Sequence, residues 1–322
     1  DGCPHCENAK TFFNSIESEY GKYYNLNMFE VWYDQKNQEI LRQFGNMNIA
    51  IHGRNFGSNF SGMLMQLFEM LKEYDMNLYV NEKFYNFMVE KTLFRPEVKG
   101  LYSDKLPEDV RFDFMLSIGG DGTFLESATF VGASGIPMLG INTGRLGFLS
   151  YVNSQNIRKA IEQLVNKEYT IEKRMLLEVS AETPFYGNIN FCLNDFSILK
   201  KSRLSMIKIK VSADDNYINT YWSDGLIVST PTGSTAYSLS CGGPIVTSQS
   251  NVMLITPIAN HNLTVRPLVI SADSEIKISV DSNEGSVLAS LDYKSYTIKN
   301  LKQITVRKAN FYINFVNLFK NT

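Results

Sequence analysis

The sequence predicts an α/β domain followed by a mostly antiparallel β domain, because the spacing of apolar residues changes along the chain. In residues 47–168, short apolar runs alternate with helical patterns, which is typical of parallel β-α-β units. From about residue 171, apolar and polar residues alternate with a period of two, which is typical of strands with one buried face. A glycine-rich turn at residues 119–123 joins one predicted strand to the helix that follows it.

Each strand and helix of the first region has its own signal in the sequence. Four short apolar runs predict strands: Asn48–Ile51, Leu78–Val80, Phe114–Ile118 and Met138–Ile141. Apolar residues three or four positions apart predict the helices: Leu64–Leu71, residues 81–91, Phe124–Phe130 and Ile157–Leu164. Strands joined through helices are parallel neighbours, so this region predicts a Rossmann-like sheet that is covered by helices.

The second region predicts a β domain over residues 169–299. Ile207, Ile209 and Val211 alternate with lysines, as expected for a strand that buries one face. Turn residues such as Asp214-Asp215-Asn216 separate such strands. We expect the C-terminal residues, about 300–322, to pack back on the α/β domain.

Residues 1–46 differ from both regions. Cys3-Pro4-His5-Cys6 precedes a helical pattern, and a dithiol at a helix start is how redox proteins stabilise a thiolate. The segment resembles the opening of a thioredoxin-like domain and covers about half of one. We interpret it as a fragment or a fusion remnant. A dithiol oxidoreductase that uses Cys3 and Cys6 is retained as an alternative function.

Composition limits the partners that the chain can have. The net charge of -2 argues against a broad electrostatic contact with nucleic acid. No run approaches the roughly 18 apolar residues that a membrane helix needs, so we expect no membrane contact. Four cysteines without a disulfide framework indicate a reducing cytoplasm. The three histidines show no metal-ligand spacing, so we expect no structural metal held by the protein.

The glycine-rich turn, Gly119-Gly120-Asp121-Gly122-Thr123, predicts a phosphate site. Glycines let the backbone approach a phosphate, and the helix that starts here adds unpaired N–H groups and a positive dipole end. An aspartate repels the phosphate that these groups attract. Its useful roles are to hold a metal ion or to take a proton from an attacking hydroxyl, which predicts a kinase. A helix-start carboxylate stabilised by the dipole is the structural alternative.

A second segment, Ser223–Ser240, carries the other strong signal. Between Ser229 and Ser240 it holds seven serine or threonine hydroxyls, a tyrosine and a Pro-Thr-Gly turn. Small hydroxyl side chains can hydrogen-bond a polar ligand without filling the space that it needs. A serine-rich turn is the structural alternative. The density of donors beside Asp224 favours a binding loop.

Together these segments resemble the NAD kinase family. The matching segments are Gly119–Thr123, Gly140–Leu149, Asn194-Asp195 and Asp224–Pro244. The resemblance extends from Met47 to about residue 319. Lipid kinases and phosphofructokinases share the glycine turn, whereas Thr230–Ser240 is far more specific. The resemblance implies a phosphofructokinase-like α/β domain and a β domain that forms a dinucleotide pocket.

The resemblance also implies roles for individual residues. Asp121 would take the proton from the 2′-hydroxyl of the adenosine ribose of NAD⁺, and Asn194 and Asp195 would grip ribose hydroxyls. The residues implied to shape the phosphate-facing turn are Gly119, Gly120 and Gly122, and those implied to surround the dinucleotide are Phe148, Asp224, Thr235, Ala236, Tyr237 and Ser240. A neighbouring subunit would supply part of this wall, so we expect a homodimer or a homotetramer.

We therefore expect phosphorylation of NAD⁺ to NADP⁺, with ATP or inorganic polyphosphate as the donor and Mg²⁺ as the divalent metal. A ribose hydroxyl is a poor nucleophile that an aligned carboxylate can activate, and Mg²⁺ neutralises donor phosphates. Arg54 and Arg145 are candidates for phosphate contacts; a surface-loop arginine is the structural alternative for Arg145. The alternative enzyme is a lipid or sugar kinase with the same glycine turn.

The sequence departs from the family pattern at Asp292-Tyr293-Lys294. Relatives commonly carry an Asp-Gly-Gln-like segment in this late β region. We therefore carry no dinucleotide contact over to the third position of the segment, which is Lys294 here.

Overall fold

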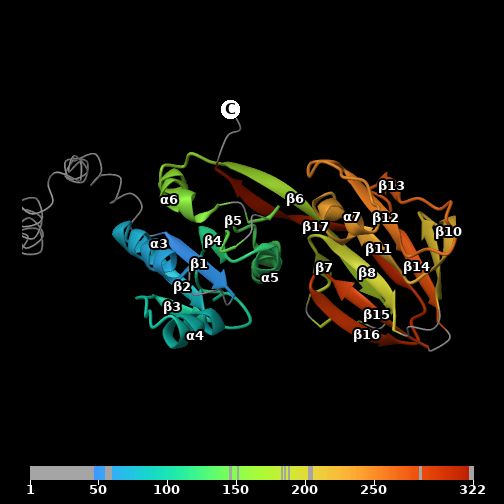
Figure 1. Ribbon diagram of the computed structural model, residues 1–322, viewed down its shortest axis with the longest axis horizontal. Helices are drawn as coiled ribbons and strands as arrows, with labels where there is room; N and C mark the ends of the chain where they lie inside the picture. The colour runs from blue at the N-terminus through green and yellow to red at the C-terminus, as the bar shows by residue number, and fades with distance from the viewer. Residues whose placement is uncertain are drawn as a thin grey trace, which may run out of the picture.

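The computed structural model describes residues 47–54, 60–144, 147–150, 152–182, 184, 186–187, 189–201, 206–282 and 285–318. It confirms the predicted fold class, because an α/β domain and a mostly antiparallel β domain lie side by side (Figure 1). Cys3 and Cys6 lie outside the described residues, together with the rest of residues 1–46.

The α/β domain is built on a parallel sheet with the strand order β5-β4-β1-β2-β3. Its strands are β1 (Asn48–Gly53), β2 (Asn77–Asn81), β3 (Gly100–Tyr102), β4 (Phe114–Ile118) and β5 (Met138–Ile141). The central strand β4 is buried along its whole length, which explains its unbroken apolar sequence. The edge strand β3 was not predicted from the sequence, because its three residues are too few to show a period.

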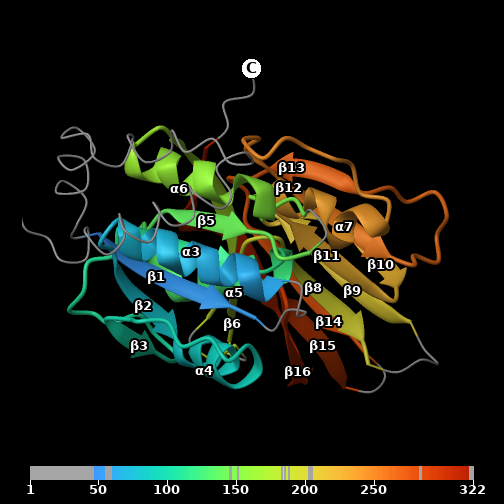
Figure 2. The same ribbon diagram turned by 60° about the vertical axis from the view of Figure 1, so that its left-hand side comes forward.

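Helices cover both faces of this sheet (Figure 2). α3 (Ser61–Glu73), α4 (Glu82–Lys91) and α6 (Ile157–Val165) bury their apolar residues in one cluster. α5 (Asp121–Val131) packs on the opposite face through Phe124. None of the helices in the described part of the chain is both long and apolar enough to cross a membrane.

Two sheets face each other in the β domain. One has the antiparallel order β13-β12-β11-β8-β15-β16. Its strands are β8 (Asp195–Lys200), β11 (Gly225–Ser229), β12 (Val252–Ile258), β13 (Leu268–Ser271), β15 (Ser286–Leu291) and β16 (Lys294–Lys299). The facing strands include β9 (Ile207–Ala213), β10 (Asn216–Ser223) and β14 (Ile276–Asp281). Apolar side chains from both sheets form one buried cluster.

Two long strands, β6 (Thr170–Ala181) and β17 (Ile304–Asn317), join the domains (Figure 1). β17 pairs with β14 of the β domain and, farther along, with β5 of the α/β domain. The short β7 (Phe191–Cys192) pairs with β6. The ring centroids of Phe315 on β17 and Phe124 on α5 are 4.7 Å apart. The helix that follows the glycine turn therefore packs against the connecting strands.

Candidate active site

The glycine turn lies at the carboxyl end of β4, where ligands of open α/β sheets bind. Gly119 is buried and donates its N–H to the Ile141 carbonyl oxygen at 2.9 Å. Gly120 precedes α5 with an extended backbone, and Asp121 is the first residue of the helix. The turn therefore presents the unpaired N–H groups of a helix start at the edge of the sheet.

The Asp121 carboxylate is held by main-chain groups of the loop that follows β5. Oδ2 accepts a hydrogen bond from the Phe148 N–H at 3.0 Å. Oδ1 accepts from the N–H groups of Leu149 at 3.0 Å and Ser150 at 3.2 Å. Gly147 lies against the same carboxylate, and a Cβ added there would overlap it. Our sequence reasoning did not assign Gly147 a role, although its presence in the matching segment Gly140–Leu149 was a usable signal.

The sequence placed two candidate binding residues, Phe148 and Arg145, in this loop region, and the structure describes only Phe148. The Phe148 side chain is 71% exposed, so it is open to a ligand or to a neighbouring chain. Arg145 lies outside the described residues.

A second carboxylate, that of Asp292, holds the Asn194-Asp195 segment of the β domain. Oδ2 accepts from the Leu193 N–H at 2.8 Å, and Oδ1 accepts from the N–H groups of Asn194 at 2.8 Å and Asp195 at 3.1 Å. Asp292 lies in the turn between β15 and β16 with a φ of 52°. Sequence reasoning treated Asp292 only as the start of a departing segment, because amides 97 or more residues away leave no local pattern.

Asp195 and Asp292 form a coupled pair of carboxyl groups. Burial, and then the charge of Asp292, raise the pKa of Asp195 to about 7. Burial raises the pKa of Asp292 to about 6, against the lowering effect of its three main-chain hydrogen bonds. Near neutral pH the pair therefore holds a proton for part of the time. A protonated carboxyl can donate a hydrogen bond as well as accept one, which suits a ribose hydroxyl.

The hydroxyl-rich loop packs directly on the backbone of Asn194. The Thr230 N–H donates to the Asn194 carbonyl oxygen at 2.9 Å, and the Thr230 hydroxyl donates to the Leu193 carbonyl oxygen at 2.6 Å. The same hydroxyl accepts from the Gly233 N–H at 3.0 Å. A Cβ added to Gly233 would lie 2.8 Å from the Asn194 Cα, so the Pro-Thr-Gly turn depends on glycine at this close approach.

The remaining predicted binding residues line the start of the short helix α7 (Tyr237–Ser240) or lie near it. Burial, and then charges that include those of Asp195 and Asp224, raise the pKa of Tyr237, whose side chain is 40% exposed. Asp224 forms an ion pair with Lys200 at 2.6 Å. Thr235 and Ala236 are half-buried and Ser240 is exposed. Tyr237, Asp224 and Asp195 therefore lie near one another. No side-chain hydrogen bond between Ser240 and these three residues is seen in the described part of the chain.

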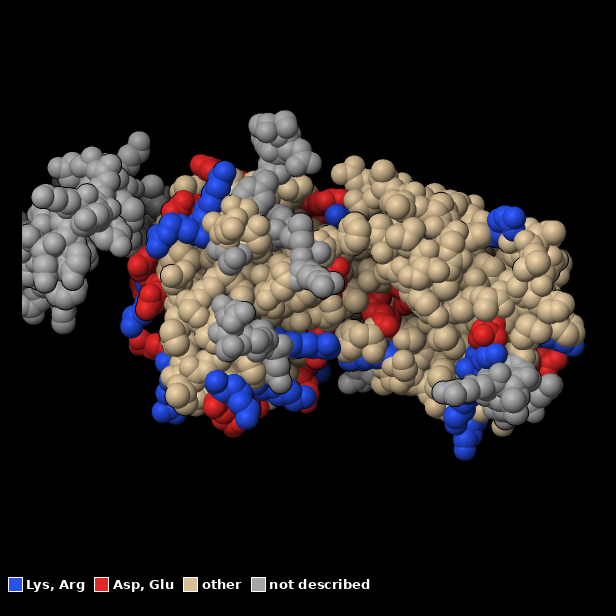
Figure 3. Space-filling view, in the orientation of Figure 1, with Lys and Arg blue, Asp and Glu red and all other residues tan. Residues whose placement is uncertain are grey.

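The two anchored turns come from different domains and approach the same junction. Leu149, whose N–H donates to Asp121, belongs to the same buried cluster as Leu193, which precedes Asn194. Phe124 of α5 is part of that cluster too. Figure 3 shows acidic side chains where the two halves of the molecule meet.

A cavity of about 890 Å³ lies between the domains. The carboxyl ends of β1 and β2 contribute His52, Arg54 and Asn81, and the β domain contributes Tyr293 and Lys294. A Cβ added to Gly122 would lie 3.8 Å from Arg54 Nη1, which places the guanidinium beside the first turn of α5. No residue of the glycine turn itself lines the cavity, so Arg54 is the group that connects the two.

Glu126 on α5 connects two basic groups of this cavity. Its Oε2 lies 2.6 Å from Arg54 Nε and 3.2 Å from His52 Nε2. His52, and with it Arg54, lower the pKa of Glu126 to about 2 against the effect of burial. Sequence reasoning did not single out Glu126, because nothing local marks a helix residue that faces the end of a distant strand.

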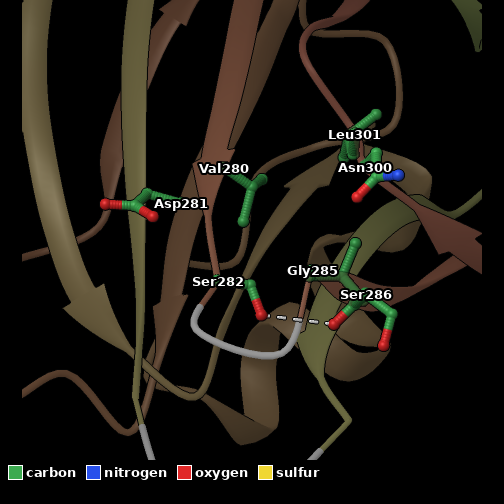
Figure 4. Close-up of a pocket in the computed structure, with 8 residues that line it drawn as sticks. Val280, Asp281, Ser282, Gly285, Ser286, Asn300 and Leu301 are labelled. Carbon is green, nitrogen blue, oxygen red and sulfur yellow. Dashed lines mark hydrogen bonds between the residues drawn. The ribbon is translucent and has the colours of Figure 1, made fainter.

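Two smaller cavities lie in the β domain and contain none of the predicted site residues. One, of about 250 Å³, lies at the ends of β14 and β15, where the Ser282 hydroxyl donates to the Ser286 carbonyl oxygen at 3.3 Å (Figure 4). The other, of about 460 Å³, is lined by residues that include Asp273 and Lys308. Of these three cavities, the one between the domains has the greatest volume, and Arg54 is the predicted site residue that lines it.

Comparison with known proteins agrees with this geometry. The sequence profile of the ATP-NAD kinase N-terminal domain matches residues 54–169, and that of the ATP-NAD kinase C-terminal domain matches residues 193–318. The chain belongs to the NAD kinase family. The NAD kinase of Flavobacterium psychrophilum is 41% identical over 278 residues, which cover 86% of this chain and 94% of that protein. The NAD kinase of Bacteroides fragilis is 40% identical over 277 residues, which cover 85% and 94%.

Solved structures of this family have the same fold. An NAD kinase from Archaeoglobus fulgidus in complex with ATP matches with a TM-score of 0.66 and 26% identity, covering 85% of this chain and 94% of that one. Yeast NADH kinase complexed with NADH matches with a TM-score of 0.73 and 24% identity, covering 85% and 84%, and shows the fold alone. The lipid or sugar kinase and the dithiol oxidoreductase gain no support from these comparisons.

Proposed function

We propose that this protein transfers the γ-phosphoryl group of ATP to the 2′-hydroxyl of the adenosine ribose of NAD⁺, giving NADP⁺ and ADP. The observation that carries the proposal is the pair of anchored turns: Asp121 in the α/β domain and Asn194-Asp195 in the β domain, at one junction. The alignment over 94% of the length of a relative named NAD kinase supports the same reaction.

In the proposed step, Asp121 accepts the proton of the 2′-hydroxyl while the hydroxyl oxygen attacks the γ-phosphorus. The bond to the bridging oxygen breaks, and ADP leaves with the electron pair. Of the described hydrogen bonds to Asp121, Oδ2 accepts one and Oδ1 accepts two. Oδ2 therefore keeps acceptor capacity for the hydroxyl.

The dinucleotide would bind to the β-domain side of the junction. The Asn194 amide and the Asp195 carboxyl would hydrogen-bond the two ribose hydroxyls, because Asp292 and the Pro-Thr-Gly turn hold their backbone. The residues proposed to complete the wall are Phe148, Asp224, Thr235, Ala236, Tyr237 and Ser240. The half-exposed Tyr237 phenol suits such a wall, since it has an apolar ring and a polar tip.

The donor would occupy the cavity between the domains, with its phosphates toward the start of α5. Arg54 lies beside that helix start, and helix N-termini favour phosphate groups. Mg²⁺ would enter bound to the donor phosphates as part of the substrate and would neutralise their charge. The described residues offer no cluster of three or more His, Cys, Asp or Glu around a common point, whereas oxygens of a triphosphate are ligands that Mg²⁺ prefers.

A homodimer or homotetramer is part of the proposal. Tyr237, Leu239 and Ile245 expose 40%, 40% and 67% of their surfaces near the dinucleotide wall. Figure 3 shows few charged side chains on the face of the β domain around α7. Light scattering during gel filtration should give a mass of at least two chains, and Ile245→Asp should lower it.

The activity is tested by mixing the protein with NAD⁺, ATP and MgCl₂ and detecting NADP⁺ with an NADP-specific dehydrogenase. We expect NADP⁺ and ADP in equal amounts, and no turnover with an NAD⁺ analogue that lacks the adenosine 2′-hydroxyl. Loss of ATP without NADP⁺, or phosphorylation of that analogue, would contradict the proposal.

A further inference from the structure

The β domain contributes a basic side chain to the cavity between the domains. Lys294, the first residue of β16, lines this cavity opposite the carboxyl ends of β1 and β2. Its Nζ lies 5.5 Å from the centroid of the Tyr293 ring, and Arg54 Cζ of the α/β domain lies 5.4 Å from the same centroid. One aromatic ring therefore contacts a cation from each domain across the cavity.

The cavity has more positive than negative side chains. Arg54, Lys83, Lys105 and Lys294 line it, together with the carboxylates of Asp104 and Glu126. Arg54 is paired with Glu126. Within the described residues, no carboxylate lies within 4.0 Å of Lys294 Nζ, and the same holds for Lys83 and Lys105. Burial lowers the pKa of Lys294, as expected for a cation that has lost water and gained little compensating charge.

A buried imidazole gives independent evidence that the cavity receives a polar ligand. His52 is 4% exposed and lines the cavity. Its Nε2 lies 3.2 Å from Glu126 Oε2, whereas Nδ1 makes no hydrogen bond to a described residue. A buried polar atom without a partner is costly, so a ligand that supplies a partner for Nδ1 would be favoured here.

We propose that Lys294 contacts the phosphate chain of the donor from the β-domain side, while Tyr293 holds Lys294 and Arg54 in place. The inference rests on the proposed function, since it takes the donor to occupy this cavity. Lys294 brings one positive charge to this side of the cavity, and Lys binds phosphate as a compact point charge. Donor binding would then depend on residues of both domains.

The test compares Lys294→Gln with Lys299→Gln, a change of the same charge at an exposed residue farther along β16. Calorimetry measures the Kd of a non-hydrolysable ATP analogue and of inorganic tripolyphosphate, both with MgCl₂. For Lys294→Gln we expect both Kd values to rise about 3- to 10-fold, as for loss of one partly exposed ionic contact. Lys294→Arg should stay within about twofold of wild type. The Kd for NAD⁺ and the melting temperature should not change.

Two results would overturn the inference. One is an unchanged Kd for tripolyphosphate in Lys294→Gln; the other is a weaker Kd for NAD⁺ with donor binding intact, which would move Lys294 to the dinucleotide side. These titrations do not depend on turnover. Failure of the wild type to form NADP⁺ would therefore overturn the proposed function separately, while the phosphate titration would still decide the role of Lys294.

Discussion

In each domain, an aspartate at the junction accepts hydrogen bonds from three consecutive main-chain N–H groups, but the surroundings of the two aspartates differ. In the α/β domain, Asp121 accepts hydrogen bonds from three consecutive main-chain N–H groups, those of residues 148–150. In the β domain, Asp292 accepts from another three, those of residues 193–195. Asp121 lies at a helix start among glycines. Asp292 instead lies near the buried carboxyl group of Asp195, and its negative charge contributes to the raised pKa of Asp195.

The difference separates two uses of an anchored carboxylate. A carboxylate at a glycine-lined helix start, half-exposed, is accessible to a substrate hydroxyl. The Asp292 carboxylate instead fixes the backbone from which Asn194 and Asp195 project. We therefore expect substitutions of Asp121 to change the chemical step and substitutions of Asp292 to change binding.

Asp121→Asn should have the largest effect, because an amide cannot take the proton of the ribose hydroxyl. We expect kcat to fall by about 10²- to 10⁴-fold, as is usual for loss of a general base, with the Kd for NAD⁺ within about threefold. The dehydrogenase-coupled assay measures the rate, and Asp109→Asn at an exposed position is the matched control. A rate near that of wild type would remove Asp121 from the mechanism.

Gly147→Ala should reduce kcat next most strongly, because the added Cβ would overlap the Asp121 carboxylate. Overpacking of this kind costs about 1–3 kcal/mol, so we expect kcat to fall by roughly 5- to 150-fold. Gly144→Ala is the control, since among the described residues no atom outside its chain neighbours lies within 4 Å of a Cβ added there. Equal rates for the two variants would show that the position of Asp121 does not depend on Gly147.

Asp292→Asn should mainly weaken dinucleotide binding. The amide nitrogen cannot accept a main-chain hydrogen bond, so the backbone at Asn194 loses part of its anchor. We expect the KM for NAD⁺ to rise about tenfold and the free energy of unfolding to fall by about 1–3 kcal/mol. Steady-state kinetics and urea unfolding measure these, with Asp281→Asn on β14 as the control. A fall in kcat at constant KM would make Asp292 resemble Asp121 and break the comparison.

Asp195→Asn should have the smallest effect of the four variants on activity. Its effect on the melting temperature should depend on pH. The native pKa of about 7 lies above the ordinary value of 3.8, so wild type loses stability as pH rises between these values. The Asn amide does not ionise, so the variant does not lose stability in this way. We expect the melting temperature of the variant minus that of wild type to grow from pH 4 to pH 7 and then level off. A difference that stays constant over this range would contradict the raised pKa.

The sequence predicted what local patterns can encode. Apolar spacing predicted the order of the central strands and helices, and the glycine turn after β4 was predicted at its observed place. Gly233 and Thr230 belong to a segment that sequence reasoning assigned to a binding loop. The partners of Asp121 and Asp292 were not predicted, because they are main-chain groups that carry no residue signature. Glu126 and His52 meet only once the sheet is formed, 74 positions apart in the chain.

The central claim is that Asp121 takes the proton from the adenosine 2′-hydroxyl of NAD⁺. A crystal structure with NAD⁺ and a non-hydrolysable ATP analogue tests it most directly, through the distance between the Asp121 carboxylate and the 2′-oxygen. We predict about 2.6–3.2 Å, which is hydrogen-bond reach. A 2′-oxygen beyond that reach and any bridging water, with Asp121 still bonded only to the amides of residues 148–150, would contradict the claim.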